Sequence, residues 1–154
     1  MVDCVSASIT IGGIVPPADL DDFIERIIDQ ELSLEWDGEP FTAADCITGQ
    51  PLSLMTHDVP WGRFDALEAF CVERGLIFTR WCDGCRLWGP QLAVFHGQGK
   101  VMNYLAGDKG QVLLDRATAG GLGSFDAVMA WFAHAERAVP PLVIAGPDGE
   151  RGHG

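Results

Sequence analysis

The stretch that decides the fold is VPWGRFDALEAFCVERGLIFTRWCDG, residues 59–84. Its apolar spacing predicts a helix over residues 61–74, and Gly75 follows as the left-handed C-terminal cap that suits glycine best. The helix is expected to turn four side chains inward: Phe64, Leu67, Cys71 and Val72. Residues 76–81 then predict a strand, and Asp83-Gly84 predicts a two-residue hairpin turn. A helix that runs directly into a strand is therefore the building unit of the fold.

A weaker copy of this unit lies 44 positions earlier, in VPPADLDDFIERIIDQELSLEW, residues 15–36. The alignment of the two copies places Leu32 on Leu76 and Leu34 on Phe78. Two copies of one helix–strand unit predict a pseudo-symmetric α+β sheet domain.

The patterns around the two units complete a β-α-β-β-α-β order, with further strands predicted at 5–11, 33–36 and 52–55. This order is the ferredoxin-like plan, in which two helices cover one face of an antiparallel sheet. We expect the first strand to end at a turn made by Gly12 and Gly13. A single α+β domain is expected over residues 1–145.

The C-terminal part predicts an extension of that sheet by a β-meander and a third helix. Short apolar segments at 91–96, 101–105 and 111–114 alternate with Gly-rich turns. Ser124 is placed to cap a helix over 125–137, and residues 142–144 suggest a last strand. The polar, Gly-rich residues 146–154 predict a disordered tail.

The helix of the first unit has one apolar and one acidic face. Its apolar residues follow the i, i+3, i+4, i+7, i+8 spacing of a single stripe: Leu20, Phe23, Ile24, Ile27 and Ile28. Its acidic residues lie on the opposite side: Asp21, Asp22, Glu25 and Asp29.

The charge of the chain is unevenly distributed. Residues 1–58 hold twelve acids and one base, Arg26, so that −11 of the net charge of −12 lies there. Such a field repels nucleic acid and anionic membranes, and it favours basic partners or cations. The alternative is that the acidity serves only solubility.

Two features predict a cytoplasmic protein. The N-terminus lacks the basic segment and apolar run of a secretory signal, and the apolar stretches are too short to span a bilayer. Five cysteines with irregular spacing favour a reduced protein over a disulfide framework.

The motif Cys82-Asp-Gly-Cys85, preceded by Trp81, superficially resembles the WCxxC of thioredoxin-like oxidoreductases. Those proteins place the first cysteine at a helix N-terminus, whereas a hairpin turn is predicted here. Zinc would need two more ligands, and no second Cys-x-x-Cys is present. We expect ordinary thiols beside a turn, with a metal at Cys82 and Cys85 as the lesser alternative, and no cofactor.

Motifs for other chemistry are weak. No phosphate-binding loop is complete, and no Ser, His and Asp grouping at known spacing predicts a nucleophile. A triad is still possible, because triads assemble from residues distant in sequence. Five tryptophans, several at predicted strand ends or turns, suit either an interface or the sealing of a sheet core.

The words SITIGG at 8–13 and VPWGRFDALEAF at 59–70 are similar to uncharacterised proteins of bacterial mobile elements. As a small, acidic, single-domain protein without a catalytic motif, the chain also resembles the inhibitors carried by phages and plasmids, anti-CRISPR and anti-restriction proteins among them. Several of those use an acidic face to occupy a nucleic-acid channel. The resemblance implies a protein of the bacterial cytoplasm but carries over no functional residues.

We therefore expect a non-enzymatic protein-binding module, an anti-CRISPR-type inhibitor that occupies a basic surface of a host effector. The expected partner is a protein, not nucleic acid or membrane, and a homodimer is possible. The candidate partner-binding residues are Asp21, Asp22, Glu25, Asp29, Glu35, Trp36, Asp37 and Trp61. Two alternatives remain: a small-ligand sensor or enzyme that uses the sheet face or the Gly-rich loops between Gly97 and Gly110, and a homo-oligomeric structural protein.

Overall fold

The computed structural model describes residues 4–46, 48–85 and 88–144, and these form an α+β structure around one open sheet. The strands are β1 (Cys4–Val15), β2 (Leu52–Pro60), β3 (Ile77–Cys82), β4 (Gln91–Phe95), β5 (Met102–Ala106), β6 (Val112–Leu113) and β7 (Leu142–Ile144). The helices are α1 (Leu20–Asp29), α2 (Asp65–Arg74), α3 (Arg116–Leu122) and α4 (Phe125–Ala135), with short 3₁₀ turns at Pro17–Asp19 and Ala43–Asp45. None of the helices in these ranges is long and apolar enough to cross a membrane.

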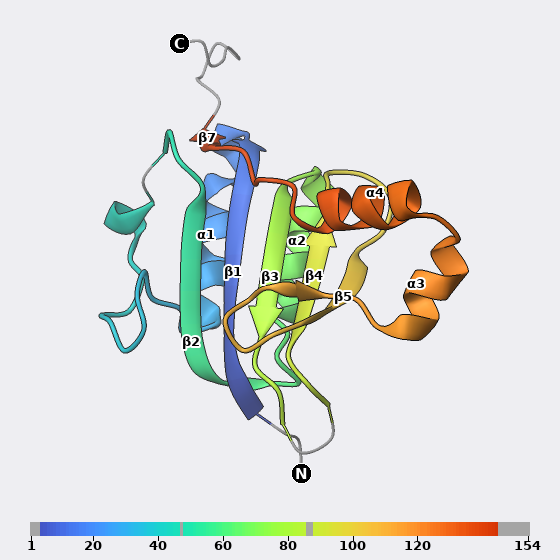
Figure 1. Cartoon of the computed structure of the whole chain (residues 1–154). Coiled ribbons are helices and arrows are strands. Elements are labelled where there is room, and N and C mark those ends of the chain that lie inside the picture. The colour runs from blue at the N-terminus through green and yellow to red at the C-terminus, as the bar shows by residue number, and fades with distance from the viewer. Residues whose placement is uncertain (1–3, 47, 86–87, 145–154) are drawn as a thin grey trace.

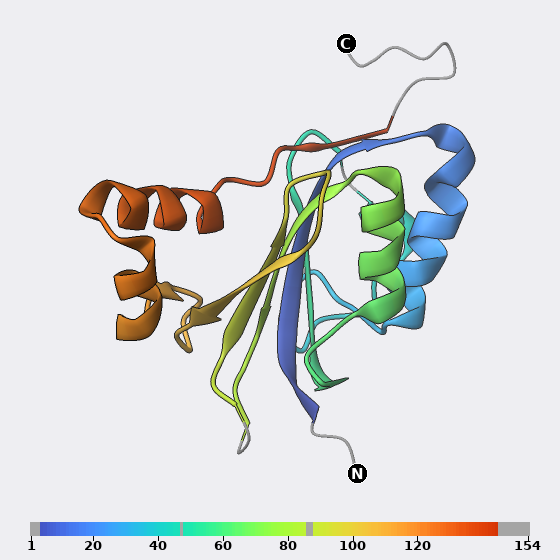
Figure 2. The same cartoon turned by 90° about the vertical axis from the view of Figure 1, so that its right-hand side faces the viewer.

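The sheet has the order β2-β1-β3-β4-β5-β6, with all neighbours antiparallel, and β7 adds to β1 in parallel. Figure 1 looks onto one face of the sheet, and α1 and α2 lie behind the other face. Figure 2 shows that α3 and α4 lie on the side opposite to α1 and α2. The sheet is thus covered by helices on both sides, but at different strands.

The alternation of side chains along β1 assigns the two faces. Val5, Ala7 and Ile9 are buried toward the helices α1 and α2, whereas Ser6 and Ser8 between them are only partly covered. Successive residues of a strand point to opposite faces, so this one strand contributes to the core on one side and presents hydroxyls on the other.

The main core lies between the sheet and the pair α1 and α2. Phe23 of α1 and Phe70 of α2 are fully buried, and their rings stack with centroids 5.5 Å apart. Gly75 ends α2 with a φ of 70°, which confirms the predicted left-handed cap. Val72 was predicted to point inward, but its side chain is 38% exposed, because it lies on the solvent side of α2.

A second, smaller core lies on the other face, beneath α4. Leu92 and Val94 of β4 and Tyr104 of β5 pack there against Trp131 and Phe132 of α4. Ser124 Oγ accepts a hydrogen bond from the backbone N–H of Ala127, which confirms Ser124 as the N-cap of this helix. The meander and third helix predicted from the sequence are therefore present.

The predicted strand at 33–36 is not formed. Ser33 makes only isolated bridges, one to Pro40 and one to Met55 of β2. The duplicated unit consequently forms a helix in both copies but a strand only in the second. The open antiparallel α+β sheet is confirmed, while one of the four strands of the predicted ferredoxin-like plan is reduced to these bridges.

Two further local predictions differ from the structure. β1 does not end at Gly12 but continues to Val15, because β7 pairs with this segment; a Cβ at Gly12 would lie 1.8 Å from the carbonyl oxygen of Pro140. Asp83-Gly84 does not form a two-residue turn, since β4 begins only at Gln91. Helix α3 was not predicted, and the predicted tail at 146–154 lies outside the described residues.

Candidate functional site

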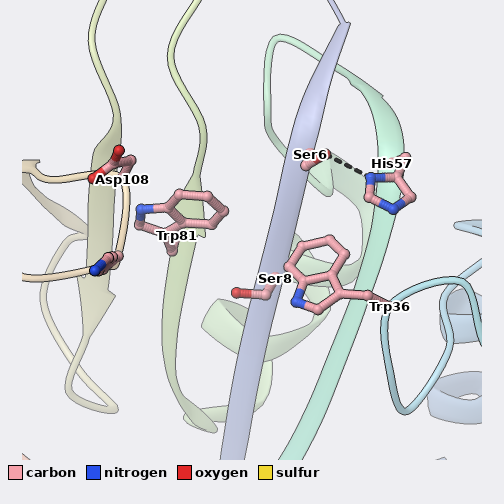
Figure 3. A pocket seen from close by; sticks show the side chains of 8 residues that line it. Ser6, Ser8, Trp36, His57, Trp81 and Asp108 are labelled. Atoms are coloured by element: carbon pink, nitrogen blue, oxygen red, sulfur yellow. Dashed lines mark hydrogen bonds between the residues drawn. The ribbon is translucent and has the colours of Figure 1, made fainter.

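The part of the sheet face that α4 leaves uncovered carries a shallow hollow of about 450 Å³. Its floor is made by β1, which contributes Ser6 and Ser8, and its sides come from segments far apart in the sequence (Figure 3). We call this hollow the sheet groove. The residues that line it are Ser6, Ser8, Trp36, His57, Trp81, Asp108, Lys109 and Gly110.

Two tryptophans stand on opposite sides of the sheet groove. Trp81 projects from β3, and its indole N–H donates a hydrogen bond to the carbonyl oxygen of Gly107 at 3.0 Å. Trp36 comes from the loop after α1 and packs against the His57 ring with centroids 5.1 Å apart. In Figure 3 the two indoles flank Ser8. A planar group that enters the groove would meet aromatic surface on both sides.

The third feature of the sheet groove is a chain of polar contacts from Ser6 through His57 to Asp37. Ser6 Oγ lies 2.6 Å from His57 Nδ1, and His57 Nε2 lies 3.2 Å from Asp37 Oδ1. A carboxylate only accepts hydrogen bonds and favours the proton on Nε2, which leaves Nδ1 of the neutral ring as acceptor for the Ser6 hydroxyl. Both hydrogen bonds therefore run in the same direction: the Ser6 hydroxyl donates to His57 Nδ1, and His57 Nε2–H donates to the Asp37 carboxylate.

A β-bulge explains why His57 reaches Ser6. Val5 pairs with Val59 but Ala7 pairs with Thr56, so β2 has one extra residue opposite Ser6. Asp58, in the bulge, has a φ of 59°, a left-handed conformation that non-glycine residues seldom adopt. Bulges re-aim side chains, and they are common beside functional sites.

The loop between β5 and β6 closes the groove on the side of Trp81. It contributes the exposed side chains of Asp108 and Lys109, one of each charge, and it turns at Gly110 with a φ of 84°. This Gly-rich loop belongs to the segment that the sequence suggested for a small-ligand site.

The predicted partner-binding residues lie in three separate places. Asp21, Asp22, Glu25 and Asp29 are on α1, in the helix layer; Glu35, Trp36 and Asp37 are in the following loop; Trp61 stacks on Trp88 beyond the end of β2, with centroids 5.8 Å apart. Of these residues, Trp36 and Asp37 contact His57.

The acidic face of α1 is only partly neutralised. Asp22 pairs with Arg26 at 3.2 Å, whereas Asp21, Glu25 and Asp29 are exposed. The neighbouring Asp19 pairs with Arg74 of α2 at 3.5 Å. Three carboxylates along one ridge of the helix therefore remain available to solvent.

Cys82 is the last residue of β3, and Cys85 lies three residues further along the chain. The Cys82 side chain is buried, and burial raises the pKa of its thiol above the ordinary value, although the nearby Arg80 opposes this shift. Within residues 4–46, 48–85 and 88–144, no group of three or more His, Cys, Asp or Glu side chains is placed to hold a metal ion.

Sequence reasoning missed Ser6, Ser8 and His57, because their proximity depends on the pairing of β1 with β2. The alternating pattern of residues 5–11 was the available signal, since it places both serines on the same face of a strand. Trp81 was noted only beside the Cys82-Asp-Gly-Cys85 motif and as one of five tryptophans.

Fold and site together define an α+β protein with a half-covered sheet whose open face carries an aromatic-walled, polar-floored groove. Comparison with known proteins returned no matching family model, no similar curated protein and no similar solved structure.

Proposed function

We propose that the protein binds a small molecule with a flat ring in the sheet groove. The observation that supports this most directly is the pair Trp36 and Trp81 on the two sides of a hollow of about 450 Å³. Ligand sites commonly combine aromatic walls with a few convergent polar groups, and volumes of roughly 300–1,000 Å³ are typical.

The polar groups of the groove specify the rest of the ligand. The hydroxyls of Ser6 and Ser8 on the floor both donate and accept hydrogen bonds, so they suit a ligand with hydroxyl or carbonyl groups on the edge of its ring. Asp108 and Lys109, of opposite charge, lie together in the loop on the Trp81 side, Asp37 contacts His57, and the whole molecule carries a net charge of −12. A neutral or cationic ligand is therefore favoured over an anionic one.

Ligand-observed NMR tests this proposal with two flat aromatic probes, indole and 4-nitrophenol, and with methyl β-glucoside, whose ring is not flat. We expect the flat aromatic probes to bind, and we expect Trp36→Ala combined with Trp81→Ala to abolish the signal. The control is Trp61→Ala, because Trp36 and Trp61 are both 41% exposed and Trp61 lies outside the groove. Aromatic binding that persists without Trp36 and Trp81 would contradict the proposal.

A second candidate function is protein binding through the acidic ridge of α1, in the manner of an anti-CRISPR-type inhibitor of a bacterial effector. The observation that favours it is the exposure of Asp21, Glu25 and Asp29 along one side of the helix. A ridge of this kind speeds association with a basic, nucleic-acid-binding surface, and its effect falls as salt increases.

Charge reversal distinguishes a partner-binding role of the α1 carboxylates from a role in solubility alone. The variant Asp21→Lys/Glu25→Lys should lose salt-sensitive inhibition of target-DNA binding by a purified RNA-guided nuclease. The control Asp108→Lys/Glu136→Lys makes the same change in net charge at two exposed residues outside α1. An equal loss of inhibition in both variants would mean that inhibition depends on net charge and not on the position of the carboxylates.

For the fold, we propose that residues 4–82 are a reduced ferredoxin-like unit. The order β3-β1-β2 and the bridge from Ser33 to the outer side of β2 support this. Ser33 and Met55 exchange backbone hydrogen bonds of 3.0 and 2.9 Å. Hydrogen exchange checks it: both amides should be protected if the missing strand persists as this bridge.

A further inference from the structure

We propose that Ser6, His57 and Asp37 act together as a nucleophile, its general base and the carboxylate that orients the base, and that they hydrolyse small carboxylic esters. The inference deepens the proposed function and rests on it, since the ester would lie in the sheet groove. It adds a reaction to what would otherwise be a binding site.

The contact between Ser6 and His57 carries the proposal. A serine hydroxyl is a weak nucleophile until a base accepts its proton, and a heavy-atom distance of about 2.6–3.2 Å is required for that transfer. Ser6 Oγ and His57 Nδ1 are 2.6 Å apart, and this contact faces the groove (Figure 3). The hydroxyl that is activated is therefore the one that a bound ligand would touch.

Asp37 completes the arrangement on the other side of the imidazole. Its Oδ1 lies 3.2 Å from Nε2, where it favours the tautomer with Nδ1 unprotonated and stabilises the imidazolium that forms when Ser6 loses its proton. The Asp37 side chain is 82% exposed, so water screens this stabilisation. Asp37 is a positioning residue, and its removal should cost less than removal of His57.

The backbone is left-handed at Asp37 and at the residue that follows His57. Asp37 has a φ of 59°, as does Asp58, the residue after His57 in the bulge of β2. Non-glycine residues in this region cost free energy, and such residues cluster at sites where function requires a particular geometry. Here the two conformations place a carboxylate and an imidazole in line with one serine.

The reaction balances without any further reagent. Ser6 Oγ bonds to the ester carbonyl carbon as its proton passes to His57 Nδ1; the carbon–oxygen bond to the alcohol then breaks, and the alcohol leaves with that proton. Water attacks the acyl-Ser6 carbonyl and gives its proton to Nδ1. The acid departs when the bond to Ser6 Oγ breaks, and the serine recovers its proton from the imidazole.

Two other groups in the groove can support the developing oxyanion. Ser8 presents a hydroxyl and Trp36 an indole N–H, and both line the same hollow as Ser6. Donors of this type stabilise the negative charge of a tetrahedral intermediate. The flat walls formed by Trp36 and Trp81 favour esters with an aromatic acyl or alcohol group.

A fluorophosphonate probe tests the proposal on the intact chain, with the labelled residue identified by peptide mass spectrometry. We expect covalent labelling of Ser6, none in Ser6→Ala, and a rate on the order of 100-fold lower in His57→Gln, since general bases contribute roughly 10²–10⁴-fold. Asp37→Asn, which tolerates the left-handed backbone, should lower the rate by roughly tenfold or less. Ser53→Ala is the matched control, because Ser53 is an exposed serine of β2 that does not line the groove, and it should label at Ser6 as the unaltered protein does.

The rates of 4-nitrophenyl butyrate hydrolysis should rank the variants in the same order as the labelling rates. Circular dichroism should show that each variant is folded. Three results would overturn the proposal. Ser6 could be labelled as fast in His57→Gln as in the unaltered protein, Ser8 could be labelled instead of Ser6, or no serine could be labelled. If Ser6 stays unreactive while indole and 4-nitrophenol bind, the nucleophile is wrong and the binding site stands. If Ser6 reacts but neither ring binds, the groove proposal is wrong and the nucleophile stands.

Discussion

The two faces of the sheet use the same strands for different purposes. Toward α1 and α2, β1 presents Val5, Ala7 and Ile9, all buried in one continuous core. On the opposite face the same strand presents Ser6 and Ser8, which α4 does not reach. The difference shows how coverage by helices, more than the strand itself, decides whether a sheet face stabilises the fold or is available to a ligand.

The polar side-chain pairs on the two faces also differ in how far they are buried. Toward α2, Arg80 Nε lies 2.8 Å from Glu68 Oε2, and both side chains are almost fully buried. On the open face, His57 and Asp37 are separated by 3.2 Å and remain exposed. A buried pair is costly to break because one charge is left without a partner, whereas an exposed pair contributes little to stability.

The largest effect should come from truncating the aromatic centre of the helix-covered face. Phe70 is fully buried against Phe23, so Phe70→Ala should lower the free energy of unfolding by about 3–5 kcal/mol. Urea denaturation measures this. Phe125→Ala is the control: that side chain is 75% exposed, and its loss should change stability by no more than about 0.5 kcal/mol.

Breaking the buried ion pair should have the next largest effect. Glu68→Leu leaves the Arg80 guanidinium buried with two acceptors, the Gly62 carbonyl oxygen and Cys82 Sγ at 4.0 Å, and it also removes the acceptor for the Phe64 backbone N–H. We expect a loss of about 3 kcal/mol in the same urea experiment. Replacing Arg80 by Met as well should recover most of it.

The comparison for that variant is the exposed pair of Arg63 and Asp65, whose charged atoms are 3.7 Å apart. Arg63→Met should cost less than about 1 kcal/mol. A similar cost for Glu68→Leu and Arg63→Met would show that burial does not distinguish these two pairs.

A smaller effect is expected in the second core. The Tyr104 hydroxyl lies 2.6 Å from His134 Nδ1 and is hydrogen-bonded to it, and burial raises the pKa of Tyr104 above the ordinary value. Tyr104→Phe keeps the ring contact with Trp131 but removes the bond, which should cost about 1 kcal/mol. Faster hydrogen exchange of the α4 amides would locate the loss; unchanged exchange there would contradict it.

The smallest effect should be a pH dependence of the same region. Burial, and then the adjacent charges of His134 and Arg137, lower the pKa of His96, although its contact with the His134 carbonyl oxygen opposes the shift. A lowered pKa means that the unfolded chain binds the proton more readily. The contribution to stability is therefore complete above the ordinary histidine pKa of about 6.5 and is lost as pH falls through the lower, folded value.

Thermal unfolding between pH 7.5 and 5 measures this dependence, and His96→Asn should flatten its acid side. The buried Nδ1 of His96 has no hydrogen-bond partner among the described residues, so protonation there is not compensated. An acid side that is equally steep in His96→Asn would assign the dependence to other groups.

The sequence predicted those parts of the fold that depend on neighbouring residues. Helices α1, α2 and α4 follow from apolar periodicity, and the caps at Gly75 and Ser124 follow from the backbone preferences of glycine and the short reach of a serine hydroxyl. The strand at 33–36 was predicted from a repeat, but the structure has a loop there that places Trp36 beside His57. Helix α3, with the sequence RATAGGL, was missed because its two glycines weaken any helical signal.

What the sequence determined by itself was the division of residues between apolar and polar faces, since spacing along one chain is enough to set that division. Only the tertiary structure brought Ser6, Asp37 and His57 together, because their proximity requires β1 to pair with β2 and the bulge at Asp58 to turn the imidazole toward Ser6. Asp37 lies 31 residues after Ser6 in the sequence, and His57 lies 51 residues after it. Contacts over such separations depend on strand register, and no local pattern encodes that register.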